Sequence, residues 1–250
     1  MRTVARALGL STVLVSSVAL AACSAPARNS DTSTTDGVVG TTTLTVPVSA
    51  TAAPGALTAF VAEVWADNWF ALFVNGTLVG QDSVPVTTER SFNSETISFT
   101  AAYPLTIAMV TRDFIQNDTG LEYIGTDRQQ MGDGGFIAQI TDTATGTVIA
   151  RTDGSWRSLV VHRAPLDVSC EKSASPQTDC SSRITPEPDN WASSSFDDSA
   201  WTPAVTYTAD EVGVKEGYFD ISWEPSARLI WSSSLKQDNT ILWRHTVTSP

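Results

Sequence analysis

Two cysteines, Cys170 and Cys180, have a spacing that suits a disulfide bond in a small loop. Nine residues separate them, and in an oxidising compartment such a pair forms one bridge. Two free thiols on a loop are the alternative, but exposed thiols are a liability outside the cytoplasm. Zinc is not expected, because neither cysteine has the close Cys or His partners that zinc takes. We therefore expect a Cys170–Cys180 disulfide if the chain is exported.

Residues for other chemistry are sparse. The chain has two histidines, His162 and His245, and both lie in strand-like runs. It contains no Gly-x-Ser-x-Gly elbow, no His-Glu-x-x-His helix and no glycine-rich phosphate loop. The many Asp and Glu residues leave open a carboxylate pair for glycoside hydrolysis. Since no motif points to such a pair, we expect a protein that is not an enzyme.

Residues 1–22 have the pattern of an export signal. Arg2 and Arg6 precede a mostly apolar stretch over residues 7–22, which is short for a membrane span of about 20 apolar residues and suits a signal peptide. The stretch ends in Leu20-Ala21-Ala22-Cys23, which resembles the lipobox of bacterial lipoproteins. The resemblance implies a lipid on Cys23 and a chain anchored outside the cytoplasm, on the bacterial cell membrane or the outer membrane. An ordinary secretory signal is the alternative, and it too implies export.

Composition and charge predict one soluble domain after a linker. Residues 23–42 are rich in Ser, Thr, Asp and Gly, as in a flexible tether behind a lipidated cysteine. Residues 43–250 are long enough for a single β-sandwich domain with its own core. Without the two signal arginines, 13 basic and 27 acidic residues remain. Such a surface repels nucleic acid, so we expect no nucleic-acid partner.

The pattern of the domain predicts many short strands and no long helix. Asn75-Gly76 lies between two apolar runs and predicts a type I′ hairpin turn, since both residues accept positive φ. Runs of alternating or apolar residues, broken by Gly, Pro, Asn and Asp, predict an all-β sandwich or jelly roll. The predicted strands are Thr43–Val48, Phe60–Trp65, Trp69–Val74, Thr96–Thr100, Leu105–Thr111, Phe136–Thr141, Val148–Thr152, Trp156–Val161, Trp201–Thr208, Arg228–Trp231 and Ile241–Val247.

Two long stretches, residues 113–135 and 163–189, fall outside this strand pattern. The second contains Cys170 and Cys180. Loops of this length in a compact domain are usually functional or fastened by other means. We expect the cysteine pair to fasten the second stretch.

Three motifs stand in an order that resembles a known fold family. They are ADNWFALFVNG at 66–76, TDGSWR at 152–157 and FDDSAW at 196–201. Together they resemble the galactose-binding-like jelly rolls of bacterial glycoside hydrolases, notably the N-terminal accessory domains of α-L-rhamnosidases. Leu229-Ile230-Trp231 and Leu242-Trp243-Arg244 occupy the matching closing positions. The resemblance implies a single jelly-roll sandwich, with the cysteine-bearing stretch as a departure, but the fold alone does not fix the function.

Two function classes follow, and they differ in what they require of exposed side chains. A carbohydrate-binding module stacks aromatic rings on sugars beside polar groups; Tyr218 and Trp223 are the aromatic candidates, in a Gly/Glu/Pro-bearing stretch. These rings could instead cover the base of a loop, and the same sandwich could serve as a protein-interaction or structural lipoprotein with no glycan ligand. Trp156, Trp201, Trp231 and Trp243 lie on predicted core strands.

Asp67 and Asn68 are the candidate polar support for a glycan. They precede a strand, where they could form a turn that bonds its own backbone. In related sugar-binding jelly rolls, such side chains can instead hold a structural Ca²⁺. Neither reading requires a cofactor, and we expect none beyond that possible Ca²⁺.

Overall fold

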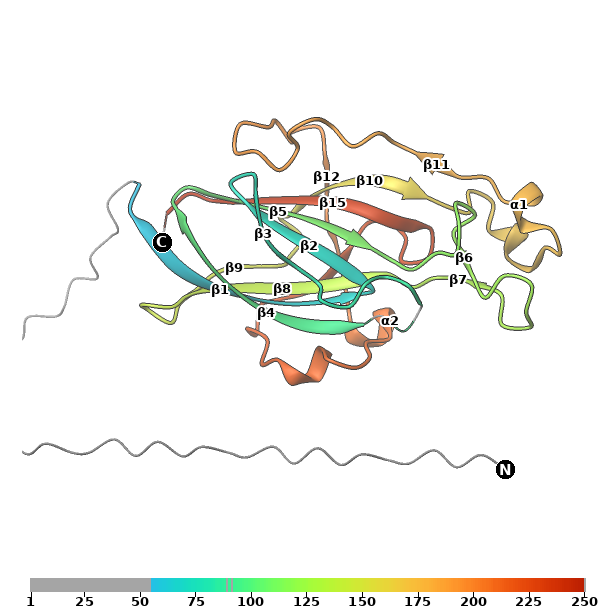
Figure 1. The fold of residues 1–250 in the computed structure, drawn as a ribbon, viewed down its shortest axis with the longest axis horizontal. Helices are drawn as coiled ribbons and strands as arrows, with labels where there is room; N and C mark the ends of the chain where they lie inside the picture. Colours follow the sequence, from blue (N-terminus) through green and yellow to red (C-terminus); the bar gives the residue numbers. More distant parts are fainter. Residues whose placement is uncertain (1–54, 89, 91, 250) are drawn as a thin grey trace, which may run out of the picture. The chain divides into compact units, whose positions relative to one another are not determined.

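The computed structural model describes residues 55–88, 90 and 92–249 (Figure 1). The expected signal peptide, Cys23, the tether and the strand predicted at 43–48 lie outside the described residues. Among the residues that are described, no helix is long and apolar enough to cross a membrane.

Two antiparallel sheets pack face to face as a sandwich (Figure 1), which confirms the prediction of an all-β jelly-roll fold. The first sheet has the order β13-β14-β8-β1-β4, with β9 paired to β8. Its strands are β1 (Leu57–Asp67), β4 (Asn93–Ala102), β8 (Gly135–Asp142), β9 (Val148–Arg151), β13 (Val205–Tyr207) and β14 (Leu229–Trp231).

The second sheet has the order β11-β10-β15-β5-β2-β3, with β12 paired to β10. Its strands are β2 (Trp69–Val74), β3 (Thr77–Gln81), β5 (Leu105–Arg112), β10 (Arg157–Arg163), β11 (Arg183–Ile184), β12 (Thr202–Pro203) and β15 (Asp238–Val247). A separate ribbon joins β6 (Leu121–Glu122) to β7 (Gln130–Met131). The helical turns are η1 (Val168–Lys172), α1 (Pro176–Asp179), α2 (Ala209–Val212) and η2 (Tyr218–Asp220).

The hairpin predicted at Asn75-Gly76 is confirmed. These residues have φ of 51° and 82° and join β2 to β3, with Val74 paired to Thr77. Asn75 also fixes the turn to the neighbouring strand, because its Oδ1 accepts a hydrogen bond from the Thr106 N–H at 2.8 Å. The turn therefore has the positive φ values that a type I′ hairpin needs.

One predicted strand, Trp201–Thr208, is wrong as a single element. The chain forms β12 in one sheet and β13 in the other, and the Ala204 N–H between them bonds the Trp156 carbonyl at 2.8 Å. Pro203 lacks an N–H and cannot continue a ladder. The segment therefore crosses between the sheets, at the edge where the candidate site lies.

The core between the sheets is built from alternate residues of each strand. Its large members include Phe60, Phe136, Trp156, Trp231 and Trp243, all 0–1% exposed. Each buried indole has a partner for its N–H: Trp243 Nε1 donates to Thr111 Oγ1, and Trp231 Nε1 to the Asp238 carbonyl, both at 2.9 Å. These bonds satisfy polar atoms that would otherwise cost free energy in the interior.

Trp201 is buried as predicted, but in a different cluster. It packs with Trp191, Ala71, Ala108 and Leu242. These strand residues alternate with those that face the core, so the cluster covers the outer face of the second sheet.

The first strand of the domain begins, and its last strand ends, at the same end of the sandwich. Leu57 at the start of β1 pairs with Ala102, and Val247 at the end of β15 pairs with Leu105. The two partner residues, Ala102 and Leu105, are only three positions apart in the chain. The opposite end carries α1 and the β6–β7 ribbon (Figure 1). Cys170 and Cys180 form the expected disulfide there, and they pack with buried Leu121 from the other long stretch.

Candidate functional site

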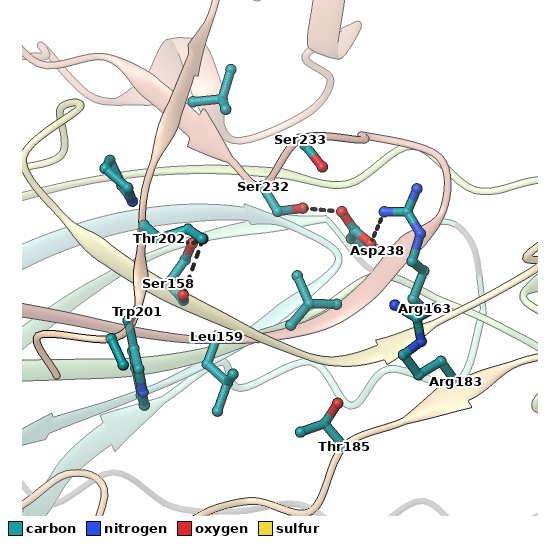
Figure 2. A pocket seen from close by; sticks show the side chains of 14 residues that line it. Ser158, Leu159, Arg163, Arg183, Thr185, Trp201, Thr202, Ser232, Ser233 and Asp238 are labelled. Carbon is teal, nitrogen blue, oxygen red and sulfur yellow. Dashed lines mark hydrogen bonds and ion pairs between the residues drawn. The ribbon is translucent and has the colours of Figure 1, made fainter.

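A pocket of about 720 Å³ opens at the edge of β10 (Figure 2). The neighbouring strands leave a gap there: β12 pairs with residues 157–158 of β10 and β11 with residues 162–163. Between them, the Val161 carbonyl accepts a hydrogen bond from the Thr185 N–H at 2.7 Å. Side chains from both sheets line the pocket: Ser158, Leu159, Val160, Arg163, Arg183, Thr185, Ala200, Trp201, Thr202, Pro203, Val205, Ser232, Ser233 and Asp238.

One wall of the pocket is a fixed polar network around Asp238. This carboxylate is fully buried. Its Oδ1 accepts from Arg163 Nη1 at 2.6 Å, and its Oδ2 from the Ser232 hydroxyl at 2.5 Å. Arg163 Nη2 also donates to Gln237 Oε1 at 2.9 Å. The network anchors the Arg163 guanidinium at the pocket and neutralises the charge of Asp238.

The opposite wall carries hydroxyl groups and an aromatic ring (Figure 2). Ser158 Oγ lies 3.1 Å from both the carbonyl and the Oγ1 of Thr202. The Trp201 side chain is 7% exposed and lies next to them. Hydroxyls beside an indole can bond and pack against the polar and apolar surfaces of one small ligand.

Arg244 fixes the segment of chain that precedes Trp201 and Thr202 in this wall. The Arg244 side chain is buried, and its Nε donates to Asp198 Oδ2 at 2.8 Å. Its Nη1 and Nη2 donate to backbone carbonyls of the same segment, those of Trp191, Ser193 and Phe196. A single guanidinium thus fixes residues 191–198.

Arg183 completes the rim of the pocket. It lies on β11, directly opposite Arg163 on β10. Both arginines lie on the side of the pocket away from Trp201 and Thr202 (Figure 2). Arg183 is exposed, whereas Arg163 is held by Asp238.

The sequence candidates Asp67 and Asn68 lie elsewhere, at the corner where the chain passes from one sheet to the other. Both are 1% exposed. Asn68 Oδ1 accepts from the Phe114 N–H at 2.6 Å, and Asp67 Oδ2 from Lys215 Nζ at 3.1 Å. Their side chains thus fix distant segments to the corner.

Asp67 belongs to a cluster of acidic side chains around Lys215. Lys215 Nζ also lies 3.3 Å from Asp133 Oδ2. Burial raises the pKa of Asp67 to about 8, although the Lys215 ammonium lowers it. Burial lowers the pKa of Lys215, but Asp67 and Asp133 outweigh this and raise that pKa above its ordinary value.

Asp113 is a buried carboxyl group next to this cluster. Burial raises its pKa well above the ordinary value, and the neighbouring Asp67 raises it further. Its carboxyl oxygens have no hydrogen-bond partner among the described residues. A raised pKa favours the neutral form of this carboxyl, which reduces the cost of an uncompensated charge in the interior.

Tyr218 and Trp223 come together over the outer face of the first sheet. Their ring centroids are 6.0 Å apart, and Tyr218 packs edge-on against Trp65 of β1. Trp223 Nε1 donates to the Tyr218 carbonyl at 3.0 Å. Both rings are half-buried, whereas the neighbouring Phe219 is 78% exposed.

The residues of the β10 pocket were not identified as candidates from the sequence. The available signal was the long stretch 163–189, which includes Arg163 and Arg183. Within the described part of the chain, no group of three or more His, Cys, Asp or Glu residues could hold a metal ion.

Comparison with known proteins found no matching family model, no matching curated protein and no matching solved structure. The resemblance to rhamnosidase accessory domains therefore stays a prediction.

Proposed function

We propose that this chain is an exported, lipid-anchored protein that binds a carbohydrate in the β10 pocket. One observation carries the proposal: the pocket combines hydroxyls, guanidinium groups and an indole around a single concave space. Its volume, about 720 Å³, is in the range of about 300–1,000 Å³ typical of small-molecule sites.

The chemistry of the lining suits sugars. A sugar presents hydroxyls that need donors and acceptors, and apolar C–H faces that pack against aromatic or aliphatic side chains. Ser158, Thr202 and Ser233 supply hydroxyls, while Leu159 and Trp201 supply apolar surface. The guanidinium of Arg163, fixed by Asp238, offers donors without a large ordering cost on binding.

The position of the pocket suits a protein that is anchored through its N-terminus. Asp238 and Arg163 lie at the end of β15 remote from Val247, and Leu57 and Val247 are at the other end. An N-terminal lipid on Cys23 and the tether that follows would extend from the Leu57 end. The Arg163 end of the pocket is thus remote from Leu57, where β1 begins.

The alternative, a protein-interaction lipoprotein, has less support at this pocket. A partner strand could add to β10 only in the gap between β12 and β11. The pairing of β10 with β12 ends at residue 158, and its pairing with β11 begins at residue 162. Added strands gain affinity from a run of backbone hydrogen bonds. So short a gap favours a compact ligand.

The Tyr218–Trp223 loop also has less support as the sugar site. Trp223 uses its indole N–H within the loop, and both rings pack on the cluster that includes Trp65. These contacts favour the reading in which the rings cover the base of the loop.

A glycan-array screen tests the proposal. The purified chain, with Cys23→Ser to remove the acylation site, is screened with and without Ca²⁺. We expect binding to a defined class of glycan, with the bound glycan recovered unchanged. No binding across a broad set of neutral and acidic glycans would contradict the proposal, and cleavage of the bound glycan would show an enzyme instead.

A further inference from the structure

We propose that the sugar bound in the β10 pocket carries a single negative charge and that Arg183 recognises it. The inference rests on the proposed function and names the ligand class of the same pocket. The shared chemistry is an acidic glycan, with the charge supplied by the carboxylate of a uronic acid or by a sulfate ester.

The charges of the pocket do not cancel. Asp238 is paired with Arg163 at 2.6 Å and is also bonded by Ser232. Arg183 forms no ion pair within the part of the chain that the structure describes, although it lines the same pocket. One positive charge is therefore left over at the pocket.

The position of Arg183 makes this unpaired positive charge unusual. Arg163 and Arg183 are direct partners across β10 and β11, and like charges directly opposite each other destabilise a sheet. The chain is strongly acidic, with a net charge of −12, yet no acidic side chain pairs with Arg183 in the described residues. A bound anion would compensate the charge of Arg183, since Asp238 is already paired with Arg163.

The geometry of a guanidinium also selects the ligand. Its planar fork donates two parallel hydrogen bonds to a carboxylate or to a sulfate oxygen pair. The hydroxyl wall of Ser158 and Thr202 lies across the pocket from this fork (Figure 2). An acidic sugar can reach both sides, with its charge at Arg183 and its hydroxyls toward the opposite wall.

Titration calorimetry on the purified chain tests the inference. The probes are tetrasaccharides that contain galacturonate, mannuronate or glucuronate, the methyl esters of these uronates, a sulfated galactan tetrasaccharide, its neutral counterpart and a polyglutamate of equal charge. We expect at least one uronate or sulfated probe to bind at least about tenfold more tightly than its uncharged counterpart and than polyglutamate. Which of them binds distinguishes carboxylate from sulfate.

Two variants locate the charge effect. Arg183→Gln should weaken binding of the preferred acidic probe at least about tenfold. Arg90→Gln removes the same charge from a side chain that is 74% exposed elsewhere and should leave affinity within about twofold. An unchanged affinity of Arg183→Gln, or equal binding of acidic and neutral probes, would overturn the inference and leave the proposed function standing. Equal binding of polyglutamate would also overturn it, and a failure to bind any glycan would overturn both.

Discussion

Lys215 Nζ lies 3.1 Å from Oδ2 of Asp67, although the two residues are 148 positions apart along the chain. Asp67 is at the corner where β1 of one sheet leads into β2 of the other. Lys215 precedes the aromatic stretch that covers Trp65 on the outer face. The hydrogen bond from Lys215 to Asp67 therefore fastens this covering segment to the corner of the sandwich.

Removing the ammonium should destabilise the fold. Lys215→Met keeps much of the stem but leaves Asp67 without its cation. We expect a loss of about 1–3 kcal/mol in the free energy of unfolding at pH 7, from urea denaturation, because a buried polar group is left unsatisfied. The loss should grow toward pH 9, where Asp67 is ionised. Lys236→Met, at an exposed position, is the matched control and should change stability by less than about 0.5 kcal/mol. Equal effects of the two variants would refute the role of the pair.

The raised pKa of Asp67 predicts a pH dependence of stability. Its folded-state pKa is about 8, above the ordinary value of 3.8, mainly because of burial. The folded state therefore holds this proton more tightly, and the stabilisation is present below about pH 4 and lost as the pH rises through 8.

Comparison with Asp67→Asn isolates this effect. The stability of the wild type relative to Asp67→Asn should fall by more than about 1 kcal/mol between pH 5 and pH 8. Urea unfolding at several pH values measures the difference, and Asp127→Asn, on the exposed connection between β6 and β7, serves as the control. A difference that is constant with pH would mean that Asp67 is not protonated in the fold.

Strands with clear alternation could be predicted from the sequence, because burial of one face imposes that pattern. Phe60–Trp65 and Phe136–Thr141 lie within β1 and β8, and Asn75-Gly76 lies at a hairpin tip. The two-residue strand β11 could not be predicted, since so short an element has no periodicity. The residues of β12 were predicted only as part of the longer run Trp201–Thr208, without the crossing between the sheets. The gap between these two strands forms the pocket.

The polar networks could not be predicted for a different reason. Arg163 and Asp238 are 75 residues apart, and each is an ordinary charged residue in its local context. Only the antiparallel pairing of β10 with β15 brings them together. The disulfide could be predicted from the sequence because Cys170 and Cys180 are the pair that remains if Cys23 carries a lipid.

The Cys170–Cys180 bridge should stabilise the far end of the sandwich. It closes a loop with a sequence separation of 10, which corresponds to about 2–3 kcal/mol in the chain-entropy account. The double variant Cys170→Ser/Cys180→Ser should lose up to this amount in thermal or urea unfolding. Faster hydrogen exchange should follow in residues 117–131, because Gln129 Nε2 donates to the Glu171 and Ser173 carbonyls at 2.8 Å. Unchanged stability and exchange would show that the bridge does not fasten these loops.

Lipid attachment at Cys23 is a separate prediction, based on Leu20-Ala21-Ala22-Cys23. In a bacterial host fed labelled palmitate, the wild-type chain should incorporate label and partition into membranes. Cys23→Ser should abolish both, while Cys170→Ser should retain the label. Undiminished labelling of Cys23→Ser would disprove the anchor.

The most direct test of the central claim compares two sites by titration calorimetry with the best ligand from the glycan screen. Ser233→Trp fills the β10 pocket from an exposed position, and Phe219→Ala removes the exposed ring beside Tyr218. We expect Ser233→Trp to weaken binding at least about tenfold, with a melting temperature within about 2 °C of the wild type, and Phe219→Ala to bind normally. Normal binding by Ser233→Trp, together with loss of binding in Phe219→Ala, would contradict the account and move the site to the Tyr218–Trp223 loop.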